Sequence, residues 1–200
     1  MKKNILFVAV MIVSVIAQAQ SCPDNNHPHA IDLGLPSRAK WSCCNVDANK
    51  PEEYGTYYAF GETKEREIYS AKCYVNERYA DKQIVSSDDV ATVKWGKLWH
   101  IPSLDDIGEL INNCTSEWTV VNGVNGRMFT GKNDNKVFLP AGGKMNILSN
   151  ESLGKLGHYW SNTEYWDDRA NAFYFYFHDG NAGVHFGGKA QGLLIRPVKK

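Results

Sequence analysis

The segment 172–188 limits the possible folds of this chain more than any other stretch. Phe173, Phe175 and Phe177 alternate there with rings that carry a polar tip, and Asp179-Gly180 follows. Successive side chains point to opposite faces of a strand, and Asp-Gly is typical of two-residue hairpin loops. We therefore expect an antiparallel hairpin in this segment, with the apolar rings sharing one face.

Such a loop fixes which residues lie opposite each other. It pairs Phe173 with Phe186, Tyr174 with His185, and Phe175 with Val184. The second face of the hairpin then carries Tyr174, Tyr176, His178 and His185. These rings suit stacking on a sugar or contact with a protein partner. The alternative is that another strand or the segment 146–156 covers them.

Helices are expected mainly in the first part of the chain. Ser103 is a helix cap with Asp106 in the capping position, and the apolar spacing predicts a helix to about Asn113. A shorter helix is expected over 88–94. Strands are expected within 30–44 and at 118–121, 127–130 and 137–139, with Asn125-Gly126 as one turn. This order indicates the α+β class with a mainly antiparallel sheet in the second part.

Residues 1–19 are typical of a secretory signal peptide. Two lysines precede an apolar run from Ile5 to Ile16, and Ala17-Gln18-Ala19 is the pattern of a cleavage site. The run is shorter than the roughly 20 residues of a membrane-spanning helix. Cys22 offers lipidation as a second route, although simple cleavage after Ala19 fits the residues better. We expect an exported chain, either secreted, periplasmic or on the cell surface, with no transmembrane segment.

The exported part is expected to comprise a flexible tail over 20–29 and a single domain over 30–200. A domain of this size buries most of the surface that its unfolded chain exposes. Lys plus Arg and Asp plus Glu both number 22. This balance shows no excess of basic residues of the kind that nucleic acid attracts, so we expect no nucleic-acid partner.

The five cysteines of an exported chain favour disulfides. With Cys22 in the tail, Cys43, Cys44, Cys73 and Cys114 allow three pairings. A bridge between the adjacent Cys43 and Cys44 would be strained. Of the two pairings that remain, we prefer the one with Cys44–Cys114, since this bridge would tie an early strand to the end of the helix. Cys43 and Cys73 are then left to form the other bridge. Buried thiols are the alternative.

Eight short strings occur in order along the chain: AIDLGLPS at 30–37, PEEYG at 51–55, YYAFGET at 57–63, WHIPS at 99–103, ELINNC at 109–114, FLPAGG at 138–143, GHYWS at 157–161 and IRPV at 195–198. Together they resemble the Fibrobacter succinogenes major paralogous domain, a family of bacterial surface and secreted proteins. The resemblance runs from about residue 28 to the end. It implies a C-type-lectin-like fold but no particular activity. Arg196, in the last string, is expected to be a structural anchor held by a buried acid or by carbonyls.

The resemblance also bears on cofactors. Calcium-dependent sugar binders of this fold carry a Trp-Asn-Asp string, where this chain has Trp160-Ser161-Asn162, and their Glu-Pro-Asn or Gln-Pro-Asp string does not occur. Related enzymes that generate formylglycine use cysteines near the end of the domain, whereas the last cysteine here is Cys114. His27, His29, Asp24 and Cys22 are metal-binding residue types. Their spacing matches no zinc site, and a flexible tail accounts for the same residues. We expect no metal and no other cofactor.

The resemblance places the segment from Tyr165 to Arg169 in a variable loop. A tryptophan beside two acids could contact the hydroxyls of a sugar there, although an ordinary solvated loop fits the same residues. The predicted ligand-binding residues are Tyr165, Trp166, Asp167, Asp168, Tyr174, Tyr176 and His185.

No Gly-x-Ser-x-Gly string or phosphate-binding loop occurs. The sequence therefore predicts a non-catalytic module that binds a glycan or a surface protein. One alternative is an enzyme similar to a thiol oxidase that uses Cys43, Cys44 or Cys73. Another is a structural subunit of a surface assembly.

Overall fold

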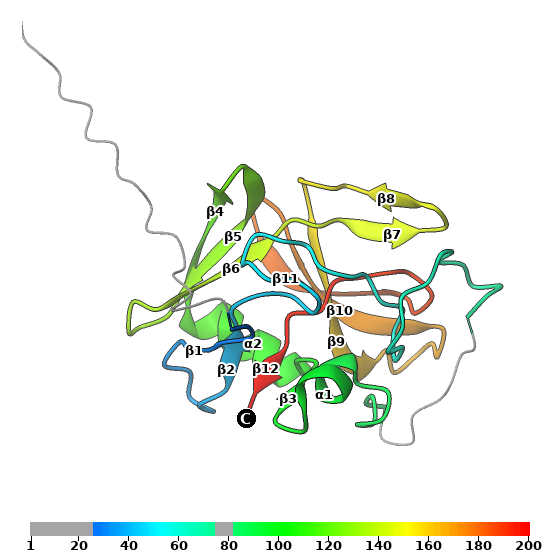
Figure 1. Cartoon of the computed structure of the whole chain (residues 1–200), viewed down its shortest axis with the longest axis horizontal. Helices are drawn as coiled ribbons and strands as arrows, with labels where there is room; N and C mark the ends of the chain where they lie inside the picture. Colours follow the sequence, from blue (N-terminus) through cyan, green and yellow to red (C-terminus); the bar gives the residue numbers. More distant parts are fainter. Residues whose placement is uncertain (1–25, 75–81) are drawn as a thin grey trace, which may run out of the picture.

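The computed structural model describes residues 26–74 and 82–200 (Figure 1). The predicted signal peptide and Cys22 lie outside these residues. The helices are α1 (Val90–Trp95) and α2 (Leu104–Asn113). The strands are β1 (Ala30–Asp32), β2 (Lys40–Ser42), β3 (Trp99–His100), β4 (Thr115–Val121), β5 (Val124–Thr130), β6 (Lys136–Pro140), β7 (Lys144–Asn146), β8 (Ser149–Glu151), β9 (Gly157–Glu164), β10 (Asn171–Phe177), β11 (Ala182–Gly188) and β12 (Val198–Lys199). Neither described helix has the length and apolar character needed to cross a membrane.

The strands form small antiparallel sheets. Their orders are β11-β10-β9, β4-β5-β6, β1-β2-β12-β3 and β7-β8. Figure 1 shows α1 and α2 on the side of the four-stranded sheet, and the β7-β8 hairpin on the opposite side. Two short helices beside antiparallel sheets give the predicted α+β class.

The hairpin of β10 and β11 has the predicted register. Phe173 pairs with Phe186, Tyr174 with His185, and Phe175 with Val184. The loop is Asp179-Gly180, because the His178 amide donates to the Asn181 carbonyl at 2.9 Å. The identity of the loop therefore determined the pairing along both strands, as expected.

The sheet of β9, β10 and β11 lies between two apolar clusters. Tyr159 and Phe175 point into the first cluster, where Ile107 of α2 is also buried. Trp160 and Tyr174 point into the second. Both faces of β10 are thus largely buried, because side chains alternate along the strand and each face meets a separate cluster.

Helix α2 begins with the predicted capping box. The Ser103 hydroxyl accepts from the Asp106 amide at 3.2 Å, and the Asp106 carboxylate accepts from the Ser103 amide at 2.9 Å. The same carboxylate binds the Lys200 ammonium at 2.8 Å. One acid therefore caps the helix and holds the C-terminal residue. Helix α1 begins at Val90, slightly later than predicted, because Asp89 is its cap.

Arg196 is fully buried and is the expected anchor. Its guanidinium donates to the Asn45 side-chain oxygen at 2.7 Å and to the carbonyls of Cys43 and Ser42 at 2.8 and 3.2 Å. A fourth bond reaches the Pro51 carbonyl at 3.2 Å. Four bonds from one planar group fix the segment after β2 against the end of the chain.

Candidate functional site

Four rings at the start of the β10-β11 hairpin form an aromatic patch: Tyr165, Trp166, Phe173 and Phe186. The Tyr165 and Phe186 rings stack with their centroids 4.0 Å apart and their planes 6° from parallel. The Trp166 ring lies 4.6 Å from that of Phe173, and Tyr165 meets Phe173 edge to face at 5.3 Å. The rings therefore support one another.

The aromatic patch combines a buried base with an exposed surface. Phe173 is only 6% exposed, whereas Trp166 is 59% exposed and Phe186 is 40% exposed. Among the described strands, β11 is at the edge of its sheet, so Phe186 has a neighbouring strand on one side only. An exposed indole held against a buried ring is already positioned for a flat ligand.

The two acids of the loop differ in role. Asp168 accepts from the Ala170 amide at 2.9 Å and from the Asn171 side chain at 2.8 Å, so it stabilises the turn that leads into β10. Asp167 is exposed, with a carboxylate oxygen 3.4 Å from the Tyr165 hydroxyl. Asp167 is therefore the acid that remains accessible to a ligand beside the aromatic patch.

Tyr174 belongs to the core. It is 8% exposed, and its ring lies 5.4 Å from that of His158 and 6.1 Å from that of Trp160. Residues of β9 therefore cover the Tyr174 ring, which was the alternative to a ligand-binding role. Its pairing partner His185 is exposed and stacks on Phe186 with the planes 22° apart. His185 thus extends the surface of the aromatic patch.

Tyr176 lies in different surroundings. With Trp118, Leu156, His178 and Asp179 it lines a surface hollow of about 410 Å³. Residues 154–156 border this hollow, so the segment proposed to cover the tyrosine face lies beside Tyr176. The predicted ligand-binding residues are therefore divided among the aromatic patch, the core and this hollow.

Phe173 and Phe186 were not predicted as site residues. The alternating pattern assigned both to the apolar face, which is correct for their direction. The pattern does not show that Tyr165 and Trp166 fold over that face, nor that an edge strand leaves Phe186 exposed. A tyrosine and a tryptophan close to an aromatic strand in sequence were the only available signal.

The predicted disulfides are not formed in the described residues, where no two of Cys43, Cys44, Cys73 and Cys114 are joined. Cys44 lies in a small buried cluster with Cys43 and Ala48. Cys114 caps the end of α2 and packs against the first apolar cluster. Cys73 is exposed near the end of the first described range. Cys43 and Cys44 thus pack in a different cluster from Cys114, and neither is bonded to Cys73.

Comparisons with models of protein families, with curated proteins and with solved structures found no match for this chain. The chemistry of the site therefore has to be read from its own residues. The aromatic patch offers flat apolar rings, and Asp167 beside it offers a carboxylate that accepts hydrogen bonds. This combination suits a ligand with one apolar face and several hydroxyl groups.

Proposed function

We propose that this chain is an exported, non-catalytic binding module with a C-type-lectin-like fold, and that it binds a glycan through the aromatic patch. The observation that carries the proposal is the position of Trp166. Its ring is 59% exposed yet packs against the buried Phe173 at 4.6 Å. A fixed, exposed aromatic ring loses little conformational entropy when a ligand stacks on it.

The neighbouring groups favour a glycan as the ligand. Sugars have flat faces of C–H groups that stack on aromatic rings, and hydroxyls around the edge that donate hydrogen bonds. The aromatic patch offers the first kind of contact through Trp166 and Phe186, and Asp167 offers the second. Because the calcium-binding strings of lectins with this fold do not occur in the sequence, binding is expected to be insensitive to a chelator.

Sequence and architecture support the fold proposal together. The eight strings lie within 30–198, and several of their residues have structural roles. Trp160 is buried in the second cluster, Leu139 is buried in the first, and Arg196 anchors the C-terminal segment. Short helices beside small antiparallel sheets agree with what the resemblance implies.

A glycan array probed with the purified full chain, with and without EDTA, tests this function. We expect a glycan that binds the chain equally in both conditions. Trp166→Ala should weaken that binding about tenfold, because an aromatic contact contributes roughly 0.5–1.5 kcal/mol beyond its buried area. Thermal unfolding should show that the variant remains folded.

Leu98→Ala is the matched control, since Leu98 is also exposed, at 58%, and belongs to a different part of the fold. It should bind like the unchanged chain. Unchanged glycan binding by Trp166→Ala would place the ligand elsewhere. An array without any bound glycan would contradict the proposed ligand class.

A further inference from the structure

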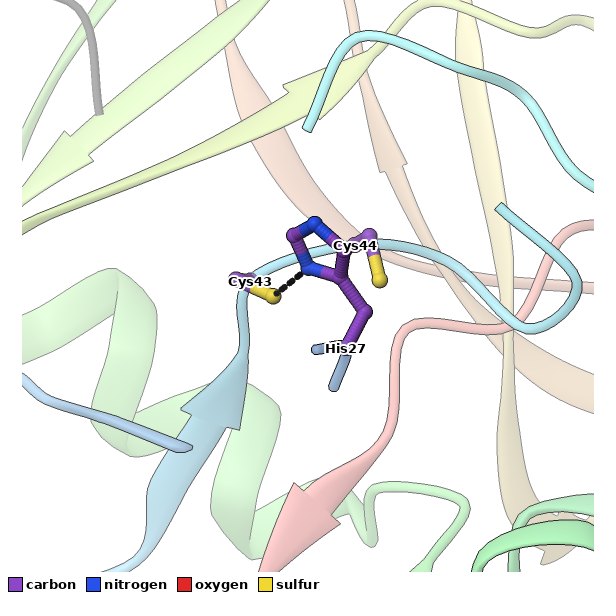
Figure 2. Close-up of side chains that lie close together, drawn as sticks. All are labelled: His27, Cys43 and Cys44. Carbon is purple, nitrogen blue, oxygen red and sulfur yellow. Dashed lines mark hydrogen bonds between the residues drawn. The ribbon is translucent and has the colours of Figure 1, made fainter. Parts of the chain in front are cut away.

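His27 and the adjacent Cys43 and Cys44 form a second cluster of reactive groups. Figure 2 shows the imidazole of His27 beside the two cysteine side chains. The Nδ1 atom of His27 lies 3.1 Å from the Cys43 sulfur. One nitrogen of His27 and both sulfurs lie within 4.8 Å of one another. One nitrogen atom and two sulfur atoms therefore form a small cluster of potential ligand atoms.

His29 contributes further groups to the cluster. Its backbone amide donates to the Cys43 sulfur at 3.1 Å, and its Nδ1 atom lies 3.7 Å from the same sulfur. The rings of His27 and His29 are 5.0 Å apart and meet edge to face. Two imidazoles therefore lie next to the Cys43 sulfur.

The backbone that carries the two sulfurs is held from several sides. The Cys43 amide donates to the His29 carbonyl at 2.9 Å, and the Ser42 hydroxyl donates to the Cys44 carbonyl at 2.8 Å. Arg196 binds the Cys43 carbonyl. Because both cysteines are also fully buried, their sulfurs have fixed positions before any ligand arrives.

The Cys43 sulfur lies 3.1 Å from both the His27 Nδ1 atom and the His29 amide nitrogen. Cysteine binds metals as a thiolate, and neutral imidazole binds them through a ring nitrogen. A disulfide between the two neighbours would have strained geometry, and none is formed here. Two buried sulfur atoms beside two imidazole rings therefore fit a metal site better than they fit a disulfide bond.

We propose that His27, Cys43 and Cys44 bind one Zn²⁺ ion. The ring of His29 lies outside this group of three, 3.7 Å from the Cys43 sulfur, and would turn toward the ion to become the fourth ligand. Two sulfurs and two imidazole nitrogens are a common tetrahedral set for structural zinc. Two thiolates balance the charge of the ion and neutral imidazoles add none, so the complex buries no net charge. A monovalent copper ion would leave one negative charge in the same buried site.

The distances are compatible with this ion. Zinc bonds of about 2.3 Å to sulfur and about 2.0 Å to nitrogen place tetrahedral ligand atoms roughly 3.3–3.8 Å apart. The spacings of 3.1 and 3.7 Å from the Cys43 sulfur to His27 and His29 lie close to this range. All spacings among the three clustered ligand atoms are within 4.8 Å, so each needs a contraction of about 1 Å at most. The bound ion would tie residues 27–29 to the end of β2.

Titration of the reduced, purified full chain with Zn²⁺ against a competing chromophoric chelator tests the site. We expect one tightly bound ion per chain. Co²⁺ in place of Zn²⁺ should give the absorption of a tetrahedral ion with sulfur ligands. We expect zinc binding to be weakened at least about tenfold by each of His27→Gln, His29→Gln and Cys43→Ser. Removing a residue that only hydrogen-bonds to a metal ligand already weakens metal binding by about this factor.

Cys73→Ser is the matched control, since Cys73 is exposed and outside the cluster; it should bind zinc like the unchanged chain. If Cys43→Ser does not fold, His27→Gln still tests the site, because His27 is only partly buried. The proposal is overturned by substoichiometric zinc, by undiminished binding in His27→Gln, or by a Cys43–Cys44 disulfide in the native protein. Undiminished binding in His29→Gln would overturn the assignment of the fourth ligand.

Discussion

His158 is a buried titratable group whose protonation should affect stability. It is 4% exposed, and its Nδ1 atom has no hydrogen-bond partner among the described residues. Burial lowers the pKa of His158 from 6.5 to about 4, and the nearby charges of Lys144 and His185 contribute to this shift. A backbone hydrogen bond at Gly143 and the charge of Glu151 act in the opposite direction. The unfolded chain therefore binds this proton more readily than the folded chain.

Stability should accordingly fall as the pH drops from about 6.5 to about 4, by roughly 3 kcal/mol from this residue. Urea denaturation of the full chain at several pH values measures the effect. His158→Gln lacks the titrating ring, so the free energy of unfolding should depend less on pH in this interval. Equal pH dependence in both proteins would show that His158 is protonated at the same pH in the folded and unfolded chains.

Helix α2 contains a glycine that the fold does not require. A Cβ atom added at Gly108 would meet no atom within 4 Å, and its φ is not in the left-handed region. Alanine is favoured over glycine inside a helix by about 0.5–1 kcal/mol. Gly108→Ala is therefore expected to raise the free energy of unfolding by about this amount, which urea denaturation can measure.

Gly131 is the matched glycine outside the helix. A Cβ atom at this position would lie 2.1 Å from the Leu33 carbonyl oxygen, so Gly131→Ala is expected to destabilise the chain. Together the two variants separate helix propensity from close packing. If both variants gain stability, or if neither does, the local surroundings of the two glycines do not determine the effect of alanine on stability.

The elements that follow from local chemistry were predictable from the sequence. The capping box at Ser103 and the Asp179-Gly180 loop place α2 and the β10-β11 hairpin correctly. The turn between β4 and β5 was predicted at Asn125-Gly126, which is wrong. The chain reads Val-Asn-Gly twice in succession over 121–126, and the turn is at the first copy.

Only the structure distinguishes the two copies. Asn122 and Gly123 both have positive φ, at 48° and 84°, as a tight hairpin turn requires. Gly126 instead lies inside β5, where a Cβ atom would be 2.4 Å from the Leu139 carbonyl oxygen. Both glycines are needed, but for a turn in one case and for close contact between strands in the other. Identical local sequence cannot reveal this difference, because it depends on β6.

At the scale of the whole molecule, residues distant in sequence come together in ways that no local pattern determines. The prediction treated His27 as part of a tail, whereas its ring lies against Cys43. It also placed Tyr174 on a possible ligand face, whereas the second apolar cluster covers that residue. Strand periodicity gives the direction of a side chain but not what lies there. Alternation therefore identified the correct aromatic strand and only part of the candidate site.

The central sheet should make the two apolar clusters unfold together, because β9 and β10 supply side chains to both. Ile107 is buried in the first cluster and Ile101 in the second. Ile107→Ala and Ile101→Ala should each lower the free energy of unfolding by about 2–5 kcal/mol. Each variant should also keep one urea transition that coincides in tryptophan fluorescence and far-ultraviolet circular dichroism, since losing either cluster exposes a face of the shared sheet.

Val120→Ala is the control, because Val120 is exposed. It should change the free energy of unfolding by no more than about 0.5 kcal/mol. Two separate transitions, with each variant shifting only one, would mean that the clusters are independent folding units.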